Sequence, residues 1–296
     1  MRRFADLYDA IDRTTSTNAK VAAVVGYLSN APAADAAWGL FFLTGRRLTR
    51  LLPSRLLHEW TLELTGLPEW VVQESYAAVG DFAEAIALML DGRVTPLAAQ
   101  NLVRAAASGS QASLFDERAT READERVSDL SLAEWIEQRI LPLRDASDAA
   151  RRVRVLQWWS RLGRRELFLL NKLLTGELRV GVSHTLVVRA IAERASLATA
   201  VVEHRLMGAW EPSAEALAAL VGPEGPADDP SRPYPFCLAS PLVDTVTSLG
   251  PRGEWLVEWK WDGIRAQVIH RAGQTFLWSR GEELITARFP EVSAFA

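Results

Sequence analysis

The sequence predicts a mainly α-helical N-terminal domain followed by the antiparallel, β-containing start of a second domain. Up to about residue 220, apolar side chains recur at three- and four-residue spacings, as they do within residues 82–90. Residues 222–235 then contain seven Gly or Pro in fourteen positions, a composition typical of a linker. After the linker the apolar period changes to two, which is the period of a strand.

These changes divide the chain of 296 residues into a helical domain, 1–221, a linker, 222–235, and a β-containing part, 236–296. Allowing about 11 to 12 residues per helix plus short connections, the first domain has room for roughly ten helices. Residues 107–129 are polar enough to form a loop or a short exposed helix. The helix boundaries are marked by proline and glycine, at Asn30-Ala-Pro32, Gly66-Leu-Pro68, Asp91-Gly92, Thr95-Pro96 and Leu141-Pro142.

The β-containing part opens with an alternating segment, residues 254–261. Trp255, Val257, Trp259 and Trp261 alternate there with charged and aliphatic side chains, which predicts a half-buried strand. Residues 264–271 and 274–279 follow, separated by Ala272-Gly273, and predict an antiparallel meander with glycine-containing turns.

The net charge of −4 argues at first against a nucleic-acid partner. The charge is unevenly placed, however, because residues 151–205 hold 11 basic and 4 acidic side chains, a net charge of +7. Local charge is what attracts a polyanion, so this basic segment is a candidate for nucleic-acid binding. A solvated helix face that keeps the protein soluble is the alternative interpretation of charge density alone.

Composition excludes several classes of protein. No apolar run of 18 residues occurs, and the charged start lacks the apolar region of a signal peptide, so we expect a soluble, cytoplasmic protein without membrane contact. Cys237 is the single cysteine, which excludes an intramolecular disulfide framework. The four histidines are scattered and offer no metal-ligand spacing, so a structural zinc site is not expected.

One string near the end of the chain combines charge and spacing in an unusual way. On the predicted strand, Glu258, Lys260 and Asp262 share the face opposite the tryptophans. Periodicity alone favours a solvent-facing row of charges. The four fixed residues of Lys260-Trp-Asp262-Gly263-Ile-Arg265 would nevertheless arise by chance in well under one chain in ~100 of this length.

The string Glu258-Trp-Lys260-Trp-Asp262-Gly263-Ile-Arg265 resembles the nucleotidyl-lysine motif of ATP-dependent DNA ligases and mRNA-capping enzymes. Ser279-Arg280-Gly281-Glu282-Glu283 is similar to the next motif of that family. The resemblance implies that Lys260 attacks the α-phosphate of ATP, releases pyrophosphate and carries AMP. It further implies that Glu258 contacts the adenine amino group and that Arg265 and Arg280 contact ribose or phosphate.

These roles agree with side-chain chemistry. A lysine is protonated at neutral pH, with a pKa of about 10.4, so a nucleophilic lysine needs desolvation or nearby cations. Arg265 and Arg280 offer forked donors to phosphate oxygens. Gly263 lets the backbone approach a ligand.

The basic segment also resembles part of this family. Gly163-Arg164-Arg165-Glu-Leu-Phe168 and Leu174-Thr-Gly176-Glu-Leu-Arg179-Val-Gly181-Val-Ser183 are similar to the all-helical N-terminal DNA-binding domain of the larger, eukaryal-type ligases. The same is true of Val79-Gly80-Asp81-Phe82. Gly181 beside Ser183 suits a tight turn into a helix capped by Ser183, whose N-terminus leaves amides free for a phosphate. The DNA-binding candidates are Arg164, Arg165, Arg179, Gly181 and Ser183.

The resemblance implies a ligase that seals nicks in double-stranded DNA with ATP and Mg²⁺, acts as a monomer and serves DNA repair, replication or recombination. No lysine follows Lys260, so the two-lysine motif that ends the family's adenylation domain is missing, and residues 236–296 correspond to a truncated adenylation domain. The metal ligands are not identified. Two alternatives remain open: a truncated chain acting as a non-catalytic DNA-binding module, and an RNA ligase or capping-type nucleotidyltransferase.

Overall fold

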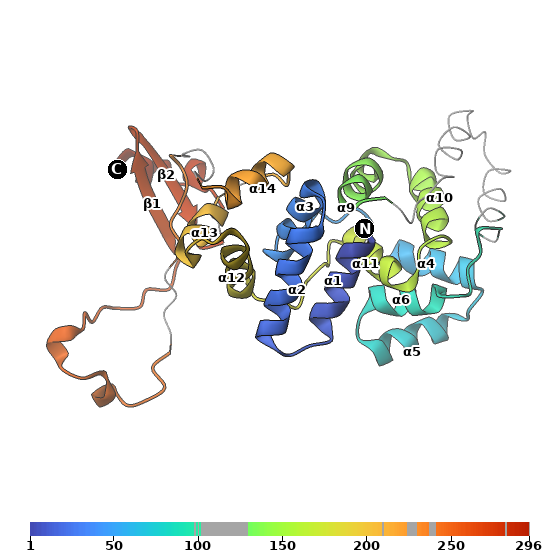
Figure 1. Cartoon of the computed structure of the whole chain (residues 1–296), viewed down its shortest axis with the longest axis horizontal. Helices are drawn as coiled ribbons and strands as arrows, with labels where there is room; N and C mark the ends of the chain where they lie inside the picture. Colours follow the sequence, from blue (N-terminus) through green and yellow to red (C-terminus); the bar gives the residue numbers. More distant parts are fainter. Residues whose placement is uncertain are drawn as a thin grey trace. The chain divides into compact units, whose positions relative to one another are not determined.

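The computed structural model describes residues 1–97, 99, 101, 130–208, 210–223, 230–236, 241–281 and 283–295. The chain divides into two compact units, whose elements are labelled in Figure 1. The first unit takes in Met1–Ser196 and Pro212–Ala218, and the second takes in Leu197–Glu211 and Ala219–Ala296. This division does not test the predicted domain boundaries at residues 221 and 235, which stay predictions.

Helices make up the regular structure of the first unit in the part of the chain that the structure describes. They are α1 (Arg2–Asp12), α2 (Thr17–Asn30), α3 (Ala33–Leu43), α4 (Ser54–Thr65), α5 (Glu69–Val79), α6 (Phe82–Leu90), α9 (Leu132–Glu134), the π-helical η1 (Trp135–Ile140), the 3₁₀-helical η2 (Leu141–Asp145), α10 (Asp148–Trp159), α11 (Arg164–Thr175) and α12 (His184–Ala195). This confirms the mainly α-helical N-terminal part that the sequence predicts.

The helix ends follow from local sequence. Asp81 precedes α6, and its Oδ1 accepts a hydrogen bond from the amide of Glu84 at 3.1 Å, which satisfies a free first-turn donor. Gly176 ends α11 with φ +68°, a left-handed conformation that glycine adopts without strain. A Cβ at this position would also lie 2.9 Å from the carbonyl oxygen of Leu48, so Gly176 is required for close backbone approach as well.

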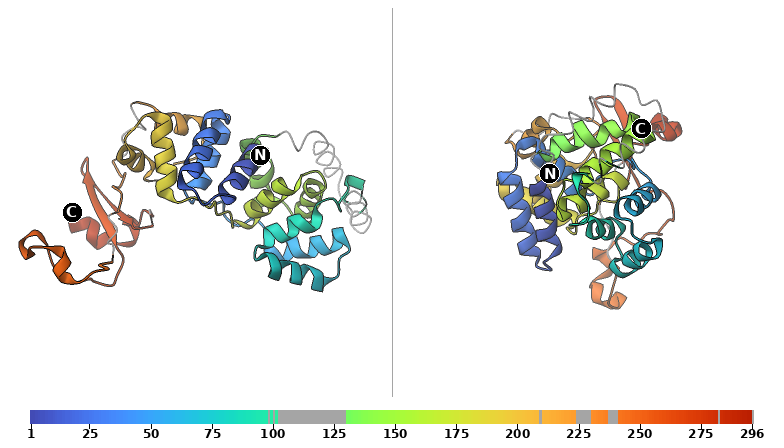
Figure 2. Two further views of the ribbon diagram at one scale, coloured as in Figure 1. Left: turned by 60° about the horizontal axis from the view of Figure 1, so that its bottom comes forward. Right: turned by 90° about the vertical axis from the view of Figure 1, so that its right-hand side faces the viewer.

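The core of the first unit forms around α11, which is buried along most of its length. Helix α1 packs against α2 and α11, α2 packs against α12, and α11 packs against α6, as the views in Figure 2 show. The buried indole of Trp159 donates to Asn171 Oδ1 at 2.9 Å, and Trp158 packs edge-on against Trp135. These contacts fix α10 beside α11 and η1 beside α10.

The second unit contains the sheet. Its regular elements are α13 (Thr199–Leu206), the end of α14 (Ala214–Val221), the 3₁₀ turns η3 (Val246–Leu249), η4 (Arg252–Glu254) and η5 (Thr286–Arg288), β1 (Ala266–Arg271), β2 (Gln274–Ser279) and α15 (Pro290–Phe295). Strands β1 and β2 pair antiparallel, from Ala266 with Ser279 to Arg271 with Gln274. The connecting Ala272 and Gly273 have φ values of 51° and 72°, as a tight hairpin turn requires. The predicted meander is therefore confirmed for these two strands.

The described linker residues lie against this sheet. Gln267 on β1 exchanges two hydrogen bonds with the backbone of Tyr234, at 3.0 and 2.6 Å. The guanidinium of Arg271 donates to the carbonyl of Arg232 and lies 5.0 Å from the ring centroid of Tyr234. Residues 230–235 are thus attached to β1 by several contacts.

The predicted half-buried strand at 254–261 is wrong. Beyond η4, residues 255–265 have no regular secondary structure, and Trp259 and Trp261 are 82% and 85% exposed. A strand needs a hydrogen-bonded neighbour, and among the described residues β1 and β2 pair with each other, apart from a single bridge between Trp278 and Leu284. The apolar alternation is present, but no described strand pairs with it.

Several expectations fall outside the described residues. These are the polar segment 107–129, Cys237, Glu282 and linker positions 224–229.

Candidate functional site

The segment around Lys260 is exposed. Glu258, Lys260 and Asp262 are all solvent-exposed, and Lys260 makes no hydrogen bond or ion pair with a described residue. The indole of Trp255 donates to the carbonyl of Leu249 at 2.5 Å, which attaches the start of the segment to η3. The structure therefore does not bring Lys260 into contact with Glu258, and the predicted separation of charged and aromatic faces on one strand is not present.

Arg265 and Arg280, by contrast, lie next to each other. They flank the pair formed by Ala266 and Ser279, and the amide of Arg280 donates to the carbonyl of Arg265 at 3.0 Å. The turn after β2 is closed by the amide of Ser279, which donates to the carbonyl of Glu283 at 2.9 Å. The hairpin thus brings together the two arginines that the sequence separates by fifteen positions.

The basic segment 151–205 does not act as a single charged surface. Arg151 donates to the carbonyls of Leu143 and Arg144, which makes it a helix-end contact. Arg152 pairs with Glu63 at 2.5 Å. Arg205, in the second unit, donates to three carbonyls at the end of α14. Much of the local positive charge therefore serves the fold, which charge counting does not reveal.

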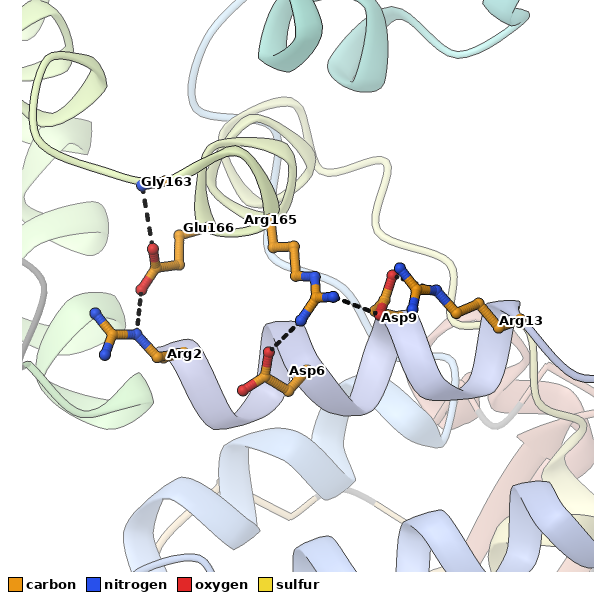
Figure 3. Close-up of polar contacts among 7 residues, drawn as sticks. All are labelled: Arg2, Asp6, Asp9, Arg13, Gly163, Arg165 and Glu166. Carbon is orange, nitrogen blue, oxygen red and sulfur yellow. Dashed lines mark hydrogen bonds and ion pairs between the residues drawn. The ribbon is translucent and has the colours of Figure 1, made fainter. Parts of the chain in front are cut away.

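Arg165 is held by carboxylates of α1. Its guanidinium lies 3.0 Å from Asp6 Oδ1 and 3.2 Å from Asp9 Oδ2, while Arg13 shares Asp9 at 3.1 Å (Figure 3). The side chain of Arg165 is 48% exposed, so solvent screens these pairs and each contributes little stability. The contacts fix the direction of the guanidinium along the surface of α1.

A second contact in the same region stabilises the start of α11. Glu166 accepts from the amide of Gly163 at 3.1 Å and from Arg2 at 3.2 Å, so one carboxylate joins the first turns of α1 and α11 (Figure 3). Arg164 is exposed, and unlike Arg165 it makes no ion pair or hydrogen bond with a described residue. Its side chain lines a cavity of about 160 Å³ together with Tyr8.

The loop from Arg179 to Ser183 carries the other three DNA-binding candidates. All three are exposed, and Ser183 is the residue before α12, as predicted. The predicted side-chain cap is not formed, because the Ser183 side chain makes no capping hydrogen bond. Its hydroxyl and the amides of His184 and Thr185 remain available, whereas the amide of Leu186 donates to the Ser183 carbonyl at 3.0 Å. Gly181 has no positive φ, and a Cβ there would be in ordinary contact at 3.9 Å, so the turn itself does not require glycine.

Helix α1 connects the two groups of candidates. Tyr8 donates from its hydroxyl to the carbonyl of Arg179 at 3.1 Å, and the next residue, Asp9, holds Arg165. Burial raises the pKa of Tyr8 to about 12, with smaller contributions from Asp12, Asp81 and Glu84, so the hydroxyl remains a donor at neutral pH. The structure therefore places the 164–165 pair and the 179–183 loop along one helix.

Sequence reasoning missed two residues that shape this site, Tyr8 and Lys20. Lys20 Nζ donates to the carbonyl of Gly181 at 2.5 Å, and the neighbouring Asn18 accepts from Arg189 at 2.9 Å. Neither Tyr8 nor Lys20 belongs to a charged run or a motif. Their partners lie 171 and 161 positions away, so no local pattern could have identified them.

In the described ranges, no group of three or more His, Cys, Asp or Glu side chains is placed to hold a metal ion. Within the same ranges, no helix is long and apolar enough to cross a membrane.

Comparison with known proteins gives one family match. A family model described as "DNA ligase N terminus" matches residues 1–192. A "DNA ligase" of Methanosphaerula palustris is 37% identical over 127 residues, which are 42% of this chain and 23% of that protein.

Two "Probable DNA ligase" sequences align along almost the whole chain. That of Koribacter versatilis is 26% identical over 99% of this chain and 47% of its own length. That of Opitutus terrae is 25% identical over 99% of this chain and 33% of its own length. The chain thus spans less than half the length of these curated relatives.

Proposed function

The chain belongs to the family of the DNA ligase N terminus, and on that premise we propose that it takes part in ATP-dependent sealing of nicks in double-stranded DNA. The family match over residues 1–192 is the observation that carries this proposal. Its helical first unit would bind the duplex, and the hairpin unit would carry the nucleotide-transferring lysine.

For nucleotide transfer, we assign the nucleophile to Lys260. Its amine, once deprotonated, forms a bond to the α-phosphorus of ATP while the bond to the bridging oxygen breaks and pyrophosphate leaves. Arg265 and Arg280, adjacent through a backbone hydrogen bond of 3.0 Å, can direct two guanidinium groups to one phosphate or ribose. Glu258, two residues before the lysine, is assigned to the adenine amino group.

Mg²⁺ would supply charge neutralisation on the phosphates. The described residues hold no cluster of three ligands suited to it, so we assign no residue to the metal.

For DNA, the proposal assigns phosphate contacts to Arg164, Arg179, Gly181 and Ser183, with Arg165 reaching a phosphate by exchanging its carboxylate partners. Exposed guanidinium groups and free amides at a helix start are the donors that phosphates accept in protein–DNA complexes. The absence of a positive φ at Gly181 supports a role in close approach to DNA, because the turn alone would accept alanine.

Labelling with α-³²P-ATP tests the assignment of Lys260. The chain, and any longer product of its reading frame, is incubated with the nucleotide and Mg²⁺, and the labelled peptide is mapped. The sequence contains three lysines, so the map is simple to interpret. We expect label on Lys260, none in Lys260→Ala, and none in Lys260→Arg, which keeps the charge but removes the nucleophile. Label retained in Lys260→Arg would refute the assignment.

Binding to nicked duplex tests the role of the first unit. The affinity should fall with added salt by roughly one log unit per log of salt for each phosphate contact. Stronger binding to a nicked RNA duplex than to nicked DNA would favour the RNA ligase or capping-type alternative. Sedimentation of the chain alone tests the proposed monomer.

A further inference from the structure

The 179–183 loop has no regular secondary structure, yet its carbonyls are fixed. Tyr8 on α1 donates to the carbonyl of Arg179, and Lys20 on α2 donates to the carbonyl of Gly181. Two helices that are distant from the loop in sequence therefore supply its hydrogen bonds.

These bonds determine where the loop amides point. In a trans peptide the carbonyl of one residue and the amide of the next point in opposite directions. With the Arg179 carbonyl turned toward α1, the amide of Val180 points away from it. The carbonyl of Val180 accepts from Val182 at 2.7 Å, so the amide of Gly181 points away from that turn. Neither amide has an acceptor among the described residues.

The support behind Tyr8 is itself well packed. Its ring lies edge-on against Phe168 of α11, with centroids 5.1 Å apart. Lys172 Nζ lies 5.7 Å from the centroid of Phe168 and is paired with Asp81. The ring of Tyr8 is therefore held by packing between α1 and α11, and the Lys172–Asp81 pair supports Phe168 from the start of α6. This packing directs the Tyr8 hydroxyl toward the loop.

We propose that Tyr8 and Lys20 are positioning residues that hold the 179–183 loop so that its amides face a DNA phosphate. This inference rests on the proposed DNA-binding function of the first unit. Neither side chain needs to touch DNA for the effect, because each acts through a loop carbonyl.

The test measures affinity of the full chain for nicked duplex at several salt concentrations. Tyr8→Phe removes a single hydroxyl and no charge. We expect affinity to fall about tenfold, the value of the one hydrogen bond from a loop amide to a phosphate that would be lost, with an unchanged salt slope. Tyr76→Phe is the matched control, because Tyr76 is 48% exposed and its hydroxyl has no partner among the described residues.

Lys20 is tested by two substitutions. Lys20→Met should lower affinity about tenfold by removing the donor to Gly181, and Lys20→Arg should restore most of it. Exchange of the Val182 amide, which donates to the carbonyl of Val180, should quicken in Tyr8→Phe and in Lys20→Met, as followed by NMR.

The outcomes separate the two ideas. If the unmodified chain does not bind nicked duplex, the proposed function fails and this inference fails with it. If the unmodified chain binds and Tyr8→Phe binds as tightly as Tyr76→Phe, the positioning role alone is refuted.

Discussion

Lys172 and Asp81 form an ion pair that joins the last turn of α11 to the residue that precedes α6. Lys172 is 11% exposed and Asp81 30%, and the other carboxylate oxygen of Asp81 caps α6 through the amide of Glu84. One carboxylate therefore satisfies both a nearly buried ammonium and a helix terminus. Lys172 also contacts the ring of Phe168, which packs against Tyr8, and Tyr8 donates to the carbonyl of Arg179. The pair therefore supports the packing of the proposed DNA-binding loop.

Lys172→Met should destabilise the first unit because it leaves Asp81 without its cation. Breaking a fully buried pair costs about 3 to 5 kcal/mol, and water reaching Asp81 should reduce this to about 2 kcal/mol. Urea unfolding followed by circular dichroism measures the change. Asp81→Asn, which keeps a capping oxygen, should cost less than Asp81→Ala. Equal stability of Lys172→Met and the unmodified chain would contradict a structural role for the pair.

Gly39 and Gly26 make a matched pair of helix glycines with opposite expectations. A Cβ at Gly39 would lie 2.8 Å from the hydroxyl oxygen of Tyr27 and 2.9 Å from its Cζ, and that buried hydroxyl donates to the carbonyl of Asp35 at 2.8 Å. Gly39→Ala should therefore destabilise by about 2 kcal/mol through overpacking.

A Cβ at Gly26 meets nothing within 4 Å, so Gly26→Ala should stabilise α2 by up to about 1 kcal/mol, the difference between alanine and glycine in a helix. Thermal unfolding of both variants is the measurement. If both substitutions stabilise, the close contact between Gly39 and Tyr27 is absent in solution.

The sequence predicts the helices well because their signals are local. The apolar spacing within 82–90 and the proline at position 68 both lie inside or beside the helices that they predict. The same is true of Ala272-Gly273, whose positive φ values close the hairpin. At 254–261 the alternation is equally clear, but a strand also needs a neighbour to pair with, which periodicity does not report.

The sequence predicts only part of the candidate site, because some of its contacts join residues that are distant in the sequence. Charge and resemblance identified Arg164, Arg165 and Arg179. Tertiary structure determines which of these cations are paired within the protein. Arg165, for example, pairs with Asp6, which lies 159 positions away in the sequence. Tyr8 and Lys20 likewise contact carbonyls of residues that are far away in the sequence, so no local sequence pattern indicates these contacts.

The raised pKa of Tyr8 predicts a loss of stability at alkaline pH. Burial, the largest cause, raises this pKa from 10.0 to about 12, so the folded state keeps the proton that the unfolded state releases. The contribution to stability is complete below pH 10.0 and is lost as the pH rises toward about 12.

Two pKa units correspond to about 2.7 kcal/mol, which solvent screening of a partly exposed ring reduces to about 1 kcal/mol. The stability of the unmodified chain relative to Tyr8→Phe should therefore fall by this amount between pH 9 and 12, as measured by urea unfolding. Burial also raises the pKa of Tyr27, but Tyr27 is present in both proteins and cancels. A difference that does not change with pH would contradict the burial of the Tyr8 hydroxyl.

The carboxylates of α1 should restrain the DNA affinity of the first unit. Asp9 lies 3.2 Å from Arg165 and 3.1 Å from Arg13, so Asp9→Asn weakens the hold on two cations at once. The exposed network contributes no more than about 1 kcal/mol to stability, and the variant should fold. We expect affinity for nicked duplex to rise by roughly three- to tenfold, with a salt slope steeper by about one, as for one added phosphate contact.

Removing any negative charge favours DNA through the general field, so the control must match the change in charge. Glu74→Gln on α5 removes one exposed carboxylate that has no partner among the described residues. It should raise affinity less than Asp9→Asn and leave the salt slope unaltered, because it releases no cation. Adding Arg165→Met to Asp9→Asn should remove the part of the gain that Arg165 contributes and leave only the part that comes from Arg13, the other cation that Asp9 holds. If Asp9→Asn binds no more tightly than Glu74→Gln, then Asp9 does not compete with phosphate for Arg165, and the ion pairs of Figure 3 serve only to hold α1 on α11.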